Sequence, residues 1–200
     1  MNDILEAIKE NARWTIEKYA SDKDFKRGKP FDVSEFFGNV LLNEGIDEIE
    51  KLICSTTATQ YDNTNARLGV GDSSAAENAT QTSLQAETNK LWKAMDATYP
   101  TLGSQVMTFK ATFGASDANY SWQEFTVVNA ADDDGKNLNR KVSDQGAKAE
   151  GQTWVKLAQL KSLLINGEHL RRYAMATLTK QALRAVQVQR LSGEKLAFAS

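Results

Sequence analysis

A strict alternation of apolar and polar side chains over residues 107–113 constrains the fold of this 200-residue chain more than any other feature of its sequence. The polar positions separate four apolar ones, which are Met107, Phe109, Ala111 and Phe113. Because successive side chains of a strand point to opposite faces of a sheet, this period of two predicts a half-buried strand. A sheet must therefore form part of the fold.

Further strand signals follow the first. Residues 120–130 form a second run rich in aromatic and β-branched side chains, and residues 131–137 contain an Asp-Gly step that is typical of a turn. Residues 138–142 are the expected second strand of a hairpin that this turn closes, and residues 152–160 supply another strand. We therefore expect an antiparallel, sandwich-like β domain over residues 56–160.

Apolar residues at helical spacing predict helices on both sides of this β domain. Such stripes occur in residues 3–20, 42–54 and 166–191, and the last of them is rich in small side chains. The expected fold class is therefore α+β. Its expected parts are an N-terminal helical arm, the β domain and a long, basic C-terminal helix, at residues 1–55, 56–160 and 161–200.

Charge is unevenly distributed along the chain, although the formal net charge is only −2. Residues 1–55 carry 8 basic and 12 acidic side chains, residues 56–160 carry 9 and 12, and residues 161–200 carry 7 and 2. The basic C-terminal segment could meet nucleic acid or an acidic protein surface, and the near absence of interleaved aromatic residues favours protein. Residues 22–30 are charged and contain a glycine and a proline, so we expect an exposed linker or arm there.

The two terminal helices are the predicted contact elements, because a monomeric β domain could not easily cover their apolar stripes. We expect them to pack on another subunit, so that the chain is a homo-oligomer that binds neither nucleic acid nor a membrane. The apolar runs are far shorter than the roughly 18 residues that span a bilayer. The predicted partner-binding residues are Leu5, Ile8, Trp14, Tyr19, Leu170, Arg171, Arg172, Ala174, Leu178 and Arg184.

Side chains that carry catalysis are scarce. The sequence has one histidine, His169, and one cysteine, Cys54, whereas catalytic triads and most zinc sites draw on histidine. Cys54 is expected to pack. Glu124 lies between Trp122 and Phe125, where a structural hydrogen-bonding role is favoured over that of a general acid. We therefore expect no enzyme activity, no cofactor and no metal site.

Two short motifs are better explained as turns than as ligand-binding sites. Residues 69–71, Gly-Val-Gly, lack the third glycine of a dinucleotide fingerprint and the lysine of a phosphate-binding loop, so a tight turn is favoured. Residues 132–135, Asp-Asp-Asp-Gly, lack the remaining positions of a calcium-binding loop. A solvated hairpin tip is the better interpretation of this run.

A family resemblance is carried by five sequence blocks in a fixed order. The blocks are NVLLNEGIDEI, YDNTNARLGVGDSSAA, NKLWKAMDATYPT, MTFKATFGASDANYSWQEFTVVNA and LNRKVSDQGAKAEGQTW, at residues 39–49, 61–76, 89–101, 107–130 and 138–154. Together they resemble a small β module of tailed-bacteriophage virion proteins, and they are similar to the N-terminal domain of phage tail-collar fibre proteins. The resemblance implies a structural virion protein, although no long repetitive shaft follows residue 160.

Three functions remain open. The first is an accessory capsid decoration or cement protein that multimerises and binds the major capsid protein through its terminal helices. The second is a tail, neck or baseplate adaptor that attaches a fibre and binds tail proteins. The third is a receptor- or glycan-binding module, in which Trp92, Tyr99, Tyr120 or Trp122 stacks on sugars. The expected location is the virion, after synthesis in the host cytoplasm.

Overall fold

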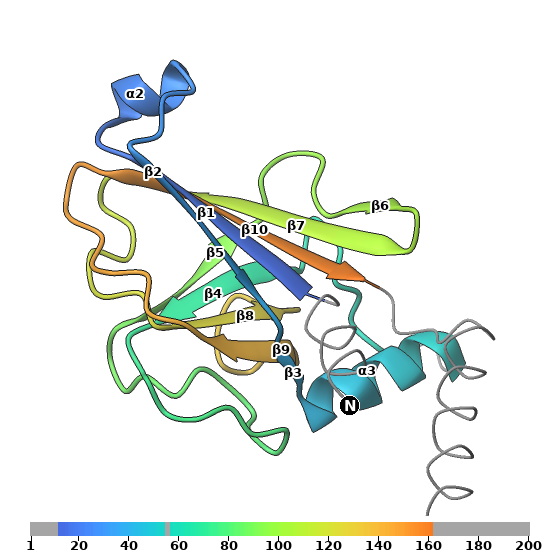
Figure 1. Cartoon of the computed structure of the whole chain (residues 1–200). Coiled ribbons are helices and arrows are strands. Elements are labelled where there is room, and N and C mark those ends of the chain that lie inside the picture. Colours follow the sequence, from blue (N-terminus) through green and yellow to red (C-terminus); the bar gives the residue numbers. More distant parts are fainter. Residues whose placement is uncertain (1–11, 55–56, 162–200) are drawn as a thin grey trace, which may run out of the picture. The chain divides into compact units, whose positions relative to one another are not determined.

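The computed structural model describes residues 12–54 and 57–161, which form two five-stranded antiparallel sheets packed face to face (Figure 1). One sheet has the strand order β2-β1-β10-β7-β6, and the other has the order β3-β9-β8-β4-β5. Two short helices, α2 and α3, are the helices of this part of the chain. The predicted C-terminal helix lies outside the described residues.

The first sheet joins segments that are far apart in the sequence. β1 pairs with β10 along its whole length, from Ala12 opposite Leu160 to Tyr19 opposite Thr153. β2 pairs with the other edge of β1, and β7 pairs with the other edge of β10. The strands of this sheet are β1 (Ala12–Tyr19), β2 (Asp32–Phe37), β6 (Thr101–Gly103), β7 (Val106–Phe113) and β10 (Thr153–Lys161).

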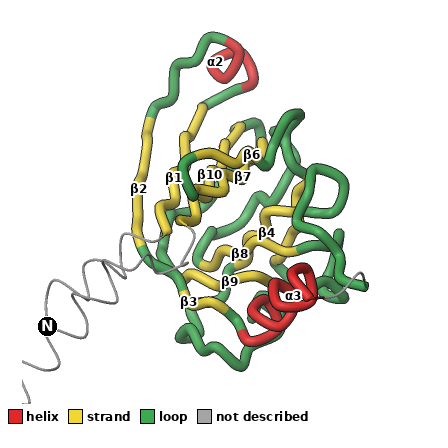
Figure 2. The backbone as a smooth tube through the Cα atoms, turned by 90° about the vertical axis from the view of Figure 1, so that its right-hand side faces the viewer, coloured by secondary structure: helices red, strands yellow, loops and turns green. Residues whose placement is uncertain are grey.

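The second sheet contains the predicted hairpin, which β8 and β9 form. Its strands are β3 (Val40–Leu41), β4 (Arg67–Gly71), β5 (Lys90–Ala94), β8 (Glu124–Val128) and β9 (Asn137–Val142). Helix α2 (Asp22–Lys26) lies in the connection between β1 and β2. Helix α3 (Asn43–Cys54) follows β3 and packs beside β9 (Figure 2).

Large aromatic side chains fill the space between the two sheets. The rings of Trp14 on β1 and Phe125 on β8 lie 6.1 Å apart, so they connect the two layers directly. Trp122 lies edge-on to Phe113 at 4.7 Å and to Trp154 at 4.9 Å. None of these five side chains is more than 2% exposed. Tilted and edge-on ring pairs at such distances are favourable, and they stabilise the packing of one sheet on the other.

The α+β fold class predicted from the sequence is wrong. Residues 12–19 form strand β1, whereas the apolar stripe over residues 3–20 predicts a helix. In β1 the buried residues Ala12, Trp14 and Ile16 alternate with more exposed ones, which is the period of a strand. The described part of the chain is an all-antiparallel sandwich with two short helices, since β-branched and aromatic residues suit a pleated, half-buried surface.

The individual strands expected after residue 100 are confirmed. The alternating run is β7, whose Phe109, Ala111 and Phe113 are buried, and the strand expected at residues 152–160 is β10. The helix expected at residues 42–54 is α3. Local patterns identified these elements because each has one face buried in the same core.

Candidate interaction surface

The two predicted partner-binding residues that the structure describes are buried. Trp14 is fully buried, and its Nε1 donates to the Gly38 carbonyl at 3.1 Å. The Tyr19 hydroxyl donates to Glu17 Oε2 at 2.7 Å, and burial together with this contact raises the pKa of Tyr19 to about 12. Neither side chain is therefore exposed for contact with a partner. The remaining predicted contacts lie outside the described residues, namely Leu5, Ile8, Leu170, Arg171, Arg172, Ala174, Leu178 and Arg184.

A fully buried ion pair joins β8 to β9. Arg140 Nη2 lies 2.7 Å from Glu124 Oε2, and both side chains are completely buried. The same carboxylate oxygen accepts from Arg140 Nε and from the backbone amide of Gln85, both at 2.8 Å. The other oxygen accepts from the Ala86 amide at 2.7 Å. These donors hold both oxygens, and the side chain is fully buried. The carboxylate therefore supports the structure and is not accessible to a substrate.

The loop between β4 and β5, residues 72–89 and here termed the strap, closes over this ion pair. Arg140 Nη1 donates to the Ala75 carbonyl at 2.9 Å, and Asn137 Nδ2 donates to the Thr82 carbonyl at 3.0 Å. Irregular loops longer than about 15 residues are uncommon in compact domains unless they are functional or disordered. Here polar side chains of the sheet hold the strap's backbone, so the strap is a fixed part of the sandwich.

A buried lysine lies in the core between the sheets. Lys156 on β10 is completely buried, and its Nζ donates to the Gly69 carbonyl at 2.8 Å. The same atom lies 4.9 Å from the ring centre of Trp14 and 4.8 Å from that of Phe125. Burial lowers the pKa of Lys156 well below its usual 10.5. Because the amine is enclosed by core residues, it cannot meet a substrate from solution.

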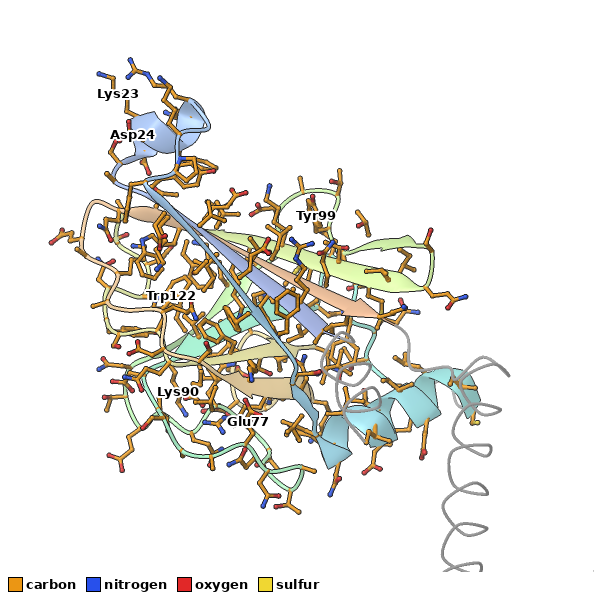
Figure 3. All side chains as sticks on the ribbon, in the orientation of Figure 1. Lys23, Asp24, Glu77, Lys90, Tyr99 and Trp122 are labelled. Atoms are coloured by element: carbon orange, nitrogen blue, oxygen red, sulfur yellow. The ribbon has the colours of Figure 1, made fainter. Side chains whose placement is uncertain are left out.

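The aromatic residues considered for stacking on sugars are buried or half-buried. Trp122 is fully buried, and Figure 3 shows it inside the sandwich. Tyr99 and Tyr120 pack against the core, and the Tyr120 hydroxyl donates to the Val70 carbonyl at 3.2 Å. Trp92 is half-buried on β5. A sugar would need exposed ring faces, so this set gives the glycan-binding hypothesis little support.

Other candidate chemistry is limited in the part of the chain that the structure describes. Within residues 12–54 and 57–161, no group of three His, Cys, Asp or Glu side chains is placed to hold a metal ion. The same residues include no helix with the length and apolar character needed to cross a membrane. Asp133, at the tip of the predicted hairpin turn, lies 2.6 Å from Lys90 Nζ. Cys54, which we expected to pack, is exposed.

A charged segment of the described surface is the connection between β1 and β2, residues 20–31, here termed the arm. Figures 1 and 3 show the arm projecting from the sandwich. Its carboxylates are engaged within the chain, since Asp22 accepts from the Thr153 hydroxyl and Asp24 accepts from the Ser21 hydroxyl at 2.7 Å. Its four cations are exposed and form no ion pair with a described residue: Lys23, Lys26, Arg27 and Lys29.

The arm has a defined conformation and carries apolar surface beside its charges. The Phe25 ring packs edge-on against the Tyr19 ring at 5.3 Å, which ties α2 to the end of β1. Phe31, at the end of the arm, is 57% exposed. Val33 and Phe37 on β2 continue this apolar surface at 50% and 49% exposure. Exposed aromatic residues next to unpaired cations are typical of a protein-binding surface.

The composition of residues 22–30 predicts an exposed arm but does not indicate that it makes contacts. Residues 22–30 were expected to be exposed, while the contact residues were placed on the flanking helices. The available signal was the concentration of four cations within residues 23–29. Its importance depends on β1 and β2 forming a pair of strands that presents the arm, and that pairing was not recognised.

Comparison of the chain with protein-family models, curated proteins and solved structures finds no match. Its function is therefore argued from the geometry of its own residues and from the resemblance of its sequence blocks.

Proposed function

We propose that the chain is a non-enzymatic structural protein of a tailed-bacteriophage virion, and that it acts as an accessory decoration or cement protein of the capsid. The blocks that resemble phage virion proteins coincide with elements of the sandwich. They cover β3, the first part of α3, β4, β5, β8 and nearly all of β7 and β9, together with the first two residues of β10. The resemblance therefore applies to the second sheet and to β7, whereas β1, β2 and most of β10 lie outside the blocks.

The observation that carries this proposal is that the polar groups in the core are engaged within the chain, whereas cations of the arm are exposed. Glu124, Arg140 and Lys156 are enclosed, and their polar atoms are engaged within the chain. Four exposed cations that form no ion pair with a described residue instead lie on the arm. A rigid body with a charged projection is suited to attachment on a lattice, where many weak contacts add by avidity.

The arm lies outside the blocks that carry the resemblance, since these begin at residue 39. It is therefore, like β1 and β2, a described part of the chain to which the resemblance does not extend. We propose that the arm, in place of the N-terminal helix expected over residues 3–20, selects the partner surface on the particle. Contacts by residues 168–190 stay a prediction, tested by incorporation of a Leu178→Asp variant into particles.

Copy number in purified virions tests the proposed function. Quantitative mass spectrometry would compare this chain with the major capsid protein in the same particles. A count close to that of the capsid subunits, or about a third of it, is expected for a decoration protein on a symmetric shell. Absence from purified particles would contradict any structural role in the virion.

The resemblance to tail-collar fibre domains supports one alternative, a tail, neck or baseplate adaptor. Such an adaptor binds at a single axial position of the particle, so it is present in about three to twelve copies. The same mass-spectrometric count therefore separates the two locations. Both locations use the sandwich as a support and the arm as a contact element.

A further inference from the structure

We infer that copies of this chain associate head to tail, with the arm of one copy seated on an acidic surface at the far end of the next. This inference deepens the proposed function, on which it rests for its biological setting, by naming the partner of the arm. Two surfaces of the described chain are complementary in charge and cannot meet within one copy.

The first surface is the cationic arm. Its four cations lack ion-pair partners among the described residues, and Phe31 adds an exposed apolar side chain at its end. The neighbouring Lys18 is already paired, since its Nζ lies 2.8 Å from Asp32 Oδ2. A partner for the arm would supply carboxylates from outside the described residues of the copy, together with some apolar area.

The second surface lies on α3 and on the turn between β8 and β9. Two contacts tie this turn to the helix: Asn129 Nδ2 donates to Glu48 Oε1 at 3.3 Å, and Lys136 Nζ lies 3.9 Å from Glu44 Oε2. The exposed carboxylates of this surface form no ion pair with a described residue, and they are Asp47, Glu50, Asp132 and Asp134.

Apolar side chains accompany these carboxylates, as they accompany the cations of the arm. Ile53 on α3 is 76% exposed and Ile46 is 39% exposed. The cations near them are already engaged, because Lys51 Nζ lies 3.6 Å from Glu48 Oε2 and Lys136 pairs with Glu44. Four unpaired carboxylates beside exposed isoleucines therefore match four unpaired cations beside an exposed phenylalanine.

The two surfaces lie at opposite ends of the sandwich. Figures 1 and 2 view the molecule at right angles to each other, and in both α2 and α3 lie at opposite ends. The arm of one copy therefore cannot reach its own α3, but it can reach that of another copy. Such a contact uses different surfaces on the two partners, so repetition produces a ring or an open row of copies. Both arrangements suit a particle surface built from repeated subunits.

A second copy fits the arm better than nucleic acid does. A polyanion would engage the arm, but the chain as a whole is net negative, which disfavours binding to a long polyanion. Phe25 stands between Lys23 and Lys26 in the sequence, but its ring packs edge-on against Tyr19 and is engaged within the chain, whereas single-stranded nucleic acid needs free aromatic faces for stacking. Head-to-tail contact instead pairs the arm with an equal number of carboxylates.

The test uses the purified full-length chain and two charge-reversed variants. In the arm variant, Lys26→Glu is combined with Arg27→Glu, and in the helix variant, Asp47→Lys is combined with Glu50→Lys. All four side chains are exposed, so both variants should fold, which circular dichroism checks. A control, Glu87→Lys, reverses an exposed carboxylate on the strap, outside both surfaces.

Sedimentation velocity over a range of protein and salt concentrations gives the readout. We expect the wild type and the control to associate at low ionic strength and to dissociate as the salt concentration rises, because the Debye length falls to about 3 Å at 1 M salt. Each charge-reversed variant should lose about tenfold or more in its association constant. An equimolar mixture of the two variants should associate again, since the acidic arm of one meets the basic helix of the other.

Three results would overturn the inference. They are a wild type that stays monomeric at low salt, a charge-reversed variant that associates like the control, and a mixture of variants that does not recover association. Binding of a duplex DNA fragment by the arm of a monomeric protein would assign the arm to nucleic acid instead. Because the assay needs no virus, failure of this inference is distinguishable from absence of the chain in virions, which bears on the proposed function.

Discussion

Replacing Arg140 by methionine removes the cation that balances the buried Glu124 carboxylate. Methionine fills similar space but has no donor, so the carboxylate would keep only the amides of Gln85 and Ala86. The strap would also lose the donor to its Ala75 carbonyl. The variant therefore leaves a buried charge uncompensated and frees one side of the strap.

The expected loss of stability is large. Breaking a buried ion pair by removing one partner costs about 3–5 kcal/mol, because the remaining charge stays desolvated. A domain of this size loses roughly 2–4 °C in Tm for each kcal/mol, so a loss of about 4 kcal/mol lowers the Tm by roughly 8–16 °C. The matched control is Arg13→Met, which breaks an exposed pair with Glu35 and should cost no more than about 1 kcal/mol.

Thermal and urea unfolding, followed by circular dichroism, measure both variants. Hydrogen exchange then shows where stability is lost, since the amides of Gln85 and Ala86 should lose protection in the Arg140→Met protein. If Arg140→Met costs no more than Arg13→Met, or if the strap amides keep their protection, the buried pair does not hold the strap and the reasoning is refuted.

Two further predictions concern packing and pH. Gly45→Ala would place a Cβ 2.6 Å from the Cα and carbonyl oxygen of Leu138, so α3 must shift from β9 at a cost of about 1–3 kcal/mol in urea unfolding. Gly103→Ala meets no atom within 4 Å and should change stability by less than about 0.5 kcal/mol, so equal effects would contradict the packing. The lowered pKa of Lys156 means that the unfolded chain binds more protons between the folded pKa and 10.5, and the free energy of unfolding therefore rises with pH through that window. Lys156→Met should remove this rise in urea unfolding measured from about pH 6 to 9, and an unchanged slope would contradict the assignment.

The elements that sequence patterns predicted well are those with one buried face. β7 shows a period of two because alternate residues enter the core, and α3 was predicted from an apolar stripe of which Ile46 and Ile53 are exposed, while Gly45 and Glu48 are its buried residues. The hairpin of β8 and β9 was recognisable from its Asp-Gly turn. In each case the information is local, so a single sequence contains it.

β1 shows why local information is insufficient. The segment ARWTIEKY fits a helical stripe when residues 3–11 are included, but it has the period of a strand when taken alone. The choice depends on pairing with β10, more than 130 residues away, which supplies the hydrogen bonds. Trp14 is buried as a result of that pairing, so it is not exposed for the partner contact that was predicted for it.

The buried ion pair was not predictable for the same reason. Glu124 was recognised as a side chain in an apolar setting, but its partners Arg140, Gln85 and Ala86 come from another strand and from the strap. The arm was recognised as exposed from its composition alone. Its role as a projecting surface follows only from the β1–β2 pair that carries it.

The most direct test of the account compares virions that carry the wild-type chain with virions that carry the Lys26→Glu/Arg27→Glu variant, using quantitative mass spectrometry of purified particles. We predict that the wild type is present at about the number of capsid subunits, or about a third of it, and that the folded variant is strongly depleted. Virions that lack the wild-type chain, or that hold the variant in undiminished number, would contradict the account.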